Sequence, residues 1–185
     1  HIDRLVIGRQ YRIFEPQWKE VILLWMGRED VEKEQKEEFI QALVEFDDGC
    51  RRFYGYRAWF IAAVGVSEFK ECSITNEIVK QIVKWGFGYF NLYKNSWQAF
   101  LKPIAEGARA IMTEMDIPLV VPLVIEVIQR CDATGGCGSD AVYTLGQIAK
   151  GNREAIAALI NLIHTSEDEL VCWRAAEGLG EIAPD

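Results

Sequence analysis

Ala141-Val142-Tyr143-Thr144-Leu145-Gly146-Gln147-Ile148-Ala149 returns in looser form further along the chain as Ala175-Ala176-Glu177-Gly178-Leu179-Gly180-Glu181-Ile182-Ala183. The two phrases share alanine, leucine, glycine and isoleucine at equivalent positions. A period of about 34 residues with apolar side chains at helical spacing is typical of stacked helical repeats. Small residues suit such repeats because helices approach closely where alanine or glycine occupies the contact. The phrase therefore predicts an all-α fold, a short α-solenoid of antiparallel helix pairs.

Most of the remaining chain also predicts helices. Residues 17–27 are apolar nearly all round and predict a buried first helix, and apolar side chains recur at helical spacing over residues 30–47, 74–85 and 156–163. Asn152 and Ser166 are expected to cap helices, and Asn95 resembles the start of a capping box that opens a helix over residues 96–114. Residues 132–140, with three glycines, are expected to form a loop. No segment alternates at period two long enough to predict a sheet.

Length and composition indicate one soluble domain. The chain has 185 residues, of which 50% are hydrophobic and 26% are charged. Residues 1–14 are interpreted as a linker or tag remnant. Residues 15–185 are interpreted as one helical repeat domain, irregular over 15–103 and clearer over 104–185. A start without methionine, and an end where another repeat helix would begin, suggest a piece of a longer protein.

The cysteines and the apolar runs indicate the cellular compartment of the protein. Five cysteines are scattered without a paired framework, which is typical of a reducing compartment. The apolar runs are too short to cross a bilayer, and no signal peptide is recognisable. We therefore expect a cytoplasmic protein that does not bind membranes.

The charge is unevenly distributed. The net charge of −8 disfavours nucleic acid as a partner. Residues 29–48 carry nine acidic residues against two lysines, whereas residues 49–102 carry eight basic residues against three acidic ones. Such runs are usually the solvated faces of helices, but the basic region is also suited to an anionic partner.

The residue types that carry catalysis or bind metal do not form a recognisable pattern. Cys131 and Cys137 lie close in sequence, but structural zinc sites take roughly four ligands. His164, the internal histidine, lies far along the chain and is expected to stabilise the end of a helix. We therefore expect a binding module rather than an enzyme, with no catalytic residue, cofactor or metal.

An aromatic cluster supplies the best candidate contact surface. Two interpretations are open: an exposed patch of the kind that dominates interfaces, or a loop folded back on the core. With the neighbouring arginines, the candidate partner-binding residues are Arg51, Arg52, Arg57, Trp85, Phe87, Tyr89, Tyr93 and Trp97.

Several stretches resemble known families. The pattern Val171…Ala175-Ala176…Leu179-Gly180…Ile182 resembles HEAT-like repeats of the phycobilisome-lyase type. Glu15-Pro16-Gln17-Trp18-Lys19-Glu20-Val21-Ile22-Leu23-Leu24 resembles the segment that follows the NTPase region in cyanobacterial NACHT signal-transduction proteins. Residues 53–58, 62–65 and 68–72 resemble the C-terminal helical array of the same family, so the resemblance covers most of residues 15–185.

The resemblance implies a sensor or autoinhibitory arm of a switch NTPase. The partner would be a protein, in particular the NTPase core of the full-length chain. The phosphate-binding motif of such a core does not occur in this sequence. The alternative implied by the repeats is a bilin-lyase-like adaptor or subunit that acts on phycobiliproteins. Nucleic-acid binding through residues 49–102 is the third and least favoured possibility.

Overall fold

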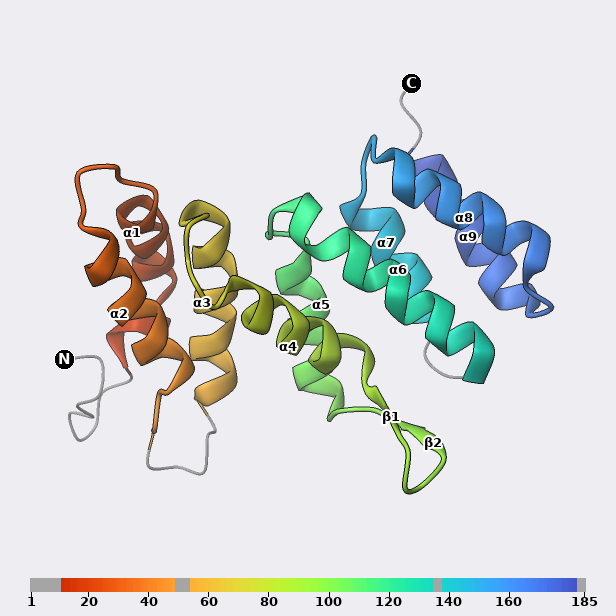
Figure 1. Ribbon diagram of the computed structural model, residues 1–185, viewed down its shortest axis with the longest axis horizontal. Coiled ribbons are helices and arrows are strands. Elements are labelled where there is room, and N and C mark those ends of the chain that lie inside the picture. Colours follow the sequence, from red (N-terminus) through yellow and green to blue (C-terminus); the bar gives the residue numbers. More distant parts are fainter. Residues whose placement is uncertain (1–10, 49–53, 135–137, 183–185) are drawn as a thin grey trace. The chain divides into compact units, whose positions relative to one another are not determined.

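The computed structural model describes residues 11–48, 54–134 and 138–182 of the chain (Figure 1). The prediction of an all-α fold is confirmed, because these residues form nine α-helices, one short 3-10 helix and one small hairpin of two strands. The elements are η1 (Arg12–Phe14), α1 (Pro16–Met26), α2 (Lys33–Val44), α3 (Gly55–Glu68), α4 (Thr75–Phe87), β1 (Tyr89–Asn91), β2 (Ser96–Gln98), α5 (Lys102–Met112), α6 (Ile117–Thr134), α7 (Gly138–Ile148), α8 (Arg153–Thr165) and α9 (Glu169–Ile182).

The helices divide into two compact units, His1–Val79 and Lys80–Asp185, and the division falls within α4. The sequence predicted a single domain from residue 15 onward. This stays a prediction. Within each of the two units, neighbouring helices pack against each other.

In the first unit, α3 packs against both α1 and α2. Its alanines and glycines make this close approach possible: a Cβ atom added at Gly65 would lie 3.3 Å from Cδ1 of Ile40 and 3.8 Å from Cγ of Met26. Both of these larger side chains are fully buried, so the small residues of α3 receive the bulky residues of its neighbours.

The first unit also contains a cluster of packed aromatic rings, to which residues before α1 contribute. Tyr11 and Phe14 are buried against Phe46, with ring centroids 5.0 and 5.6 Å from its ring. Phe14 also stacks on Tyr54 at 5.7 Å. Residues 11–14 therefore belong to the folded unit rather than to a linker, and residues 1–10 lie outside the described part of the chain.

The second unit contains two successive helical hairpins, α6–α7 and α8–α9, and α7 also packs along α9. These two helices carry the repeated phrase. They cross at glycine, since a Cβ atom added at Gly146 would lie 2.7 Å from Cα of Gly178. The small residues were expected where two antiparallel helices meet. Here they lie between α7 and α9 of successive hairpins, which run in the same direction, since Gly138 faces Val171 and Gly146 faces Gly178.

Of the two predicted helix caps, one is confirmed and one is not. Asn152 does cap α8, and its Oδ1 accepts a hydrogen bond from the backbone N–H of Ala155 at 3.0 Å. For α9 the cap is Asp168, whose Oδ1 accepts from the N–H groups of Leu170 and Val171, whereas the hydroxyl of Ser166 accepts from the N–H of Asp168.

Helix also extends where a loop was predicted, because α6 continues to Thr134 and α7 begins at Gly138. The predicted helix over 96–114 was wrong at its start. Residues 96–98 form β2, and α5 begins at Lys102.

Candidate functional site

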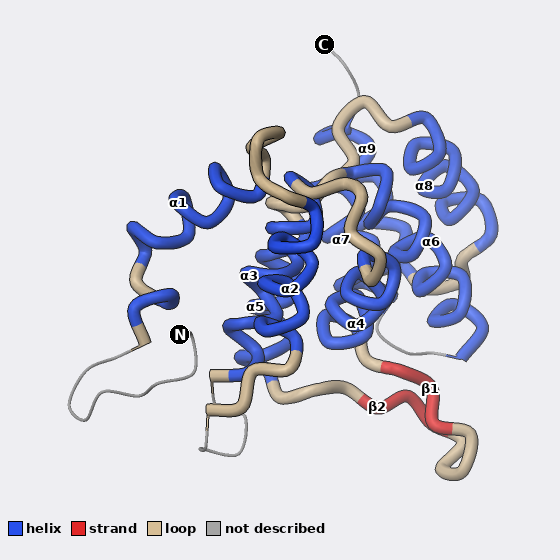
Figure 2. The backbone as a smooth tube through the Cα atoms, turned by 60° about the vertical axis from the view of Figure 1, so that its left-hand side comes forward, coloured by secondary structure: helices blue, strands red, loops and turns tan. Residues whose placement is uncertain are grey.

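A short β-hairpin follows α4 and builds one wall of the candidate site (Figure 2). Gly88 ends the helix with a φ of +88°, a conformation that favours glycine. A Cβ atom at this position would also lie 2.7 Å from Nε1 of Trp97. The chain therefore turns sharply and brings β2 back against the end of α4.

Strand pairing and a hydrogen bond from an indole hold the hairpin in place. Phe90 pairs with Trp97 across the antiparallel strands, and Nε1 of Trp97 donates to the carbonyl oxygen of Phe87 at 2.6 Å. In the turn, Oδ1 of Asn91 accepts from the N–H of Tyr93 at 3.0 Å. Because the hydrogen bond ties the indole to α4, Trp97 has a fixed position in the wall.

A hollow of about 350 Å³ lies between α4, the hairpin and α6. We call it the hairpin pocket. All of its lining residues belong to the second unit. They are Lys80, Val83, Lys84, Gly88, Tyr89, Phe90, Trp97, Leu123, Glu126, Val127 and Arg130.

The pocket combines cations with aromatic rings. Lys80 and Lys84 lie one turn apart on α4, and Nζ of Lys84 is 4.8 Å from the centre of the Tyr89 ring. On α6, the guanidinium Nη2 of Arg130 lies 2.7 Å from Oε1 of Glu126. The lining thus carries three cations against one anion, and a carboxylate ligand would find a net positive surface there.

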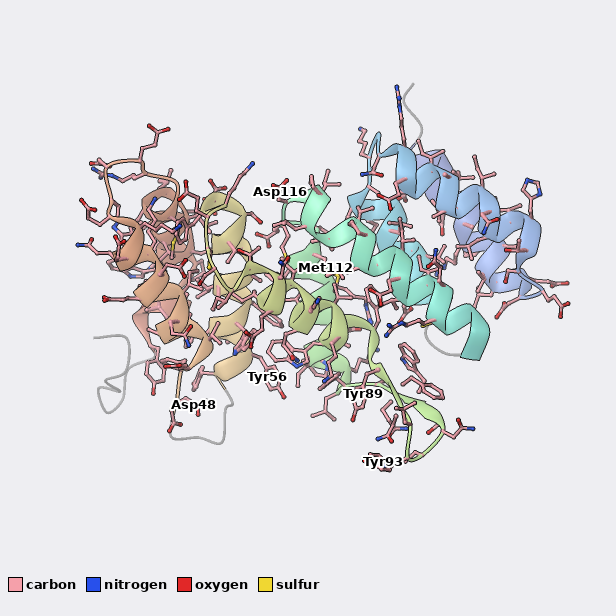
Figure 3. The ribbon with its side chains drawn as sticks, viewed as in Figure 1. Asp48, Tyr56, Tyr89, Tyr93, Met112 and Asp116 are labelled. Carbon is pink, nitrogen blue, oxygen red and sulfur yellow. The ribbon has the colours of Figure 1, made fainter. Side chains whose placement is uncertain are left out.

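The five aromatic residues of the predicted contact surface separate into three groups. Tyr89 and Trp97 line the pocket, and Tyr93 is fully exposed at the tip of the hairpin (Figure 3). Trp85 and Phe87 are 8% and 2% exposed, so they are not part of the expected contact surface. Trp85 is buried because it continues the apolar stripe of Ile78 and Ile82 on α4, whereas Phe87, two residues further on, is buried on another side of the helix.

The arginines do not belong to this pocket. Arg57 lies in the first unit, where its guanidinium is 5.3 Å from the centre of the Phe14 ring and donates to the carbonyl oxygen of Phe14 at 3.3 Å. Arg51 and Arg52 lie outside the described residues.

Sequence reasoning missed the basic residues of the pocket. The spacing of Lys80 and Lys84, and of Glu126 and Arg130, marks each pair as neighbours on one helix face. That signal was present in the sequence. It does not reveal that α6 faces the hairpin, which depends on tertiary packing.

The described residues show neither a cluster of metal ligands nor a membrane-spanning helix. Within residues 11–48, 54–134 and 138–182, no group of three or more histidine, cysteine, aspartate or glutamate side chains is placed to hold a metal ion. In the same ranges, no helix combines the length and apolar composition needed to cross a bilayer.

Comparisons of the chain with protein-family models, with curated proteins and with solved structures found no match. The hairpin pocket is therefore the feature of the chain that bears on function.

Proposed function

We propose that this chain is a non-catalytic protein–protein interaction module whose hairpin pocket binds an acidic segment of a partner protein. The observation that carries the proposal is the lining of the pocket, where Lys80, Lys84 and Arg130 surround aromatic and aliphatic side chains. Carboxylates of a partner would pair with the cations, and an adjacent apolar side chain would contact Tyr89 and Trp97.

The expected affinity is modest. Burial of one apolar anchor contributes about 1.5–3 kcal/mol, and each exposed ion pair contributes about 0.2–1 kcal/mol. One anchor and three ion pairs then give about 2–6 kcal/mol, which corresponds to a dissociation constant no tighter than tens of micromolar. Such a contact forms and breaks readily, as a regulatory contact must.

The finer proposal comes from the resemblance to NACHT-type proteins. In it, the module is a sensor or autoinhibitory arm, and the acidic segment belongs to the NTPase core of the same full-length protein. The arm would hold the core closed until a ligand competes for the pocket, which is a shift of populations rather than a chemical step.

The alternative proposal is a bilin-lyase-like adaptor or subunit that acts on phycobiliproteins. It is favoured by the same lining, because aromatic rings and cations suit a planar ligand that bears carboxylates. This alternative predicts a bound tetrapyrrole with visible absorbance.

The experiment is a selection of peptides from a random library displayed on phage, with the immobilised full chain as bait. We expect enriched peptides to carry aspartate or glutamate beside an apolar residue. Their capture should be lost with Lys84→Glu/Arg130→Glu and kept with the matched control Lys150→Glu, which reverses an exposed lysine that does not line the pocket. Enriched peptides without acidic residues, or equal capture by both variants, would contradict the proposal.

A parallel titration with biliverdin tests the alternative. A change in its absorbance spectrum that depends on Lys84 and Arg130 would favour the adaptor. An unchanged spectrum, together with acidic peptides from the selection, would favour the interaction module.

A further inference from the structure

The repeated phrase places equivalent residues in two different environments. On α7, Val142 and Gly146 are buried, and Gly146 lies at the crossing with α9. The crossing is close, since a Cβ atom at Gly146 would lie 2.7 Å from Cα of Gly178. In the first copy of the phrase, this face is therefore a docking surface for the next hairpin.

The second copy presents the same face uncovered. Ala176 and Gly180 are the equivalents of Val142 and Gly146, and both are exposed. Among the described residues, nothing lies within 4 Å of a Cβ atom added at Gly180. The second copy thus keeps the glycine of the crossing without the helix that crosses there.

An aromatic side chain extends this face of α9. Trp173, Ala176 and Gly180 follow a spacing of three and four residues, which places them on one side of the helix. Trp173 is 55% exposed, and the guanidinium of Arg174 lies 4.7 Å from the centre of its ring. Arg174 also forms an ion pair with Glu177 at 2.7 Å, which fixes the position of the guanidinium beside the indole.

We propose that this α9 face, defined by Trp173, Ala176 and Gly180, is a docking surface for a further hairpin of the same repeat. The added hairpin would stack on α8–α9 as α8–α9 stacks on α6–α7. The argument rests on continuity with an interface present in the structure, because the equivalent face of α7 is covered in this way. The proposal is independent of the hairpin pocket.

The experiment extends the full chain. Residues 150–183 are repeated once after Ala183, in place of Pro184 and Asp185, so that the period of the phrase is kept. Ala176→Cys then reports on the face, because the equivalent residue in α7 is the larger Val142 and a thiol will fit beneath the added hairpin. The rate of reaction of this cysteine with a thiol reagent is followed by peptide mass spectrometry, with Lys102→Cys as an exposed control.

We expect the cysteine at position 176 to react at least about tenfold more slowly in the extended chain than in the original chain. The control cysteine should react equally in both. Leucine in place of the added copy's equivalent of Gly178 should restore fast reaction, because the crossing needs a small residue.

Unchanged reactivity in the extended chain would overturn the proposal. Sedimentation of the original chain provides the second test. If the original chain is a dimer and its cysteine at position 176 is already protected, the occupant is a second copy, and the proposal is wrong.

Discussion

The crossing of α7 and α9 offers a matched pair of substitutions in one repeated phrase. Gly146→Ala and Gly180→Ala both replace a helical glycine at the same position of the phrase, and each gains about 0.8–1 kcal/mol of helix propensity. They differ in what the new methyl group meets. At Gly146 it meets Cα of Gly178 at 2.7 Å, whereas the described residues place nothing within 4 Å of it at Gly180.

The expected difference in stability between the two variants follows from what each methyl group meets. Overpacking of a close contact typically costs about 1–3 kcal/mol, and here the neighbour is backbone, which does not rotate away. We therefore expect Gly180→Ala to stabilise the protein by up to about 1 kcal/mol. Gly146→Ala should lie about 1–3 kcal/mol below it, which for this chain length is a difference in melting temperature of roughly 2–12 °C.

The assay is thermal unfolding of both variants followed by circular dichroism at matched concentration. Gly178→Ala provides a third measurement, since a Cβ atom at that position would lie 3.3 Å from Cα of Gly146, a looser contact. Its melting temperature should lie between the other two. Equal melting temperatures for Gly146→Ala and Gly180→Ala would refute the close crossing on which this packing depends.

Three further predictions concern single side chains. Asn152→Ala removes the cap of α8 and should lower the free energy of unfolding by about 1 kcal/mol in urea, with Asn152→Asp close to the parent protein. Trp97→Phe removes the hydrogen bond to the carbonyl of Phe87 and should cost about 1–3 kcal/mol; unchanged stability would show that the indole does not hold the hairpin. Burial raises the pKa of the Cys72 thiol above its ordinary value of 9.0. The raised pKa belongs to the folded state. The contribution of the protonated thiol to the free energy of unfolding is therefore fully present below pH 9 and is lost as the pH rises through the folded-state pKa. The loss of stability above pH 9 should be smaller in Cys72→Ala, and equal slopes would contradict the burial argument.

The parts of the fold that were predicted correctly depend on local spacing. The phrase around Gly146 predicted a close helix contact because period and small residues are visible in the sequence. Asn152 was predicted as a cap because its acceptor reaches an N–H group three residues away, a contact that needs no tertiary information.

The hairpin was not predicted because its signals are ambiguous. Each strand has three residues, which is too short to show alternation. Asn95 resembled a helix cap, but it adopts a φ of +47° in the turn between the strands. Asparagine favours both environments, and here the turn determined the outcome.

The candidate site was predicted in part for a similar reason. Aromatic residues near the end of α4 were recognisable from composition, but the sequence does not show which of them face the core. Phe87 is buried, whereas Tyr89, two residues later and beyond the turn at Gly88, lines the pocket. The contribution of Arg130 depends on α6 facing the hairpin, which no local pattern reveals.

A charge-swap titration measures whether the hairpin pocket recognises acidic peptides. A peptide enriched in the selection is labelled and titrated by fluorescence anisotropy with the full chain and with Lys84→Glu/Arg130→Glu. The double reversal removes two attractive contacts and adds two repulsive ones, so we predict at least about fourfold weaker binding. A peptide with lysines in place of its acidic residues should bind the reversed pocket more tightly than the original one. If the double variant binds the acidic peptide as tightly as the parent does, the pocket is not the recognition site and the account is wrong.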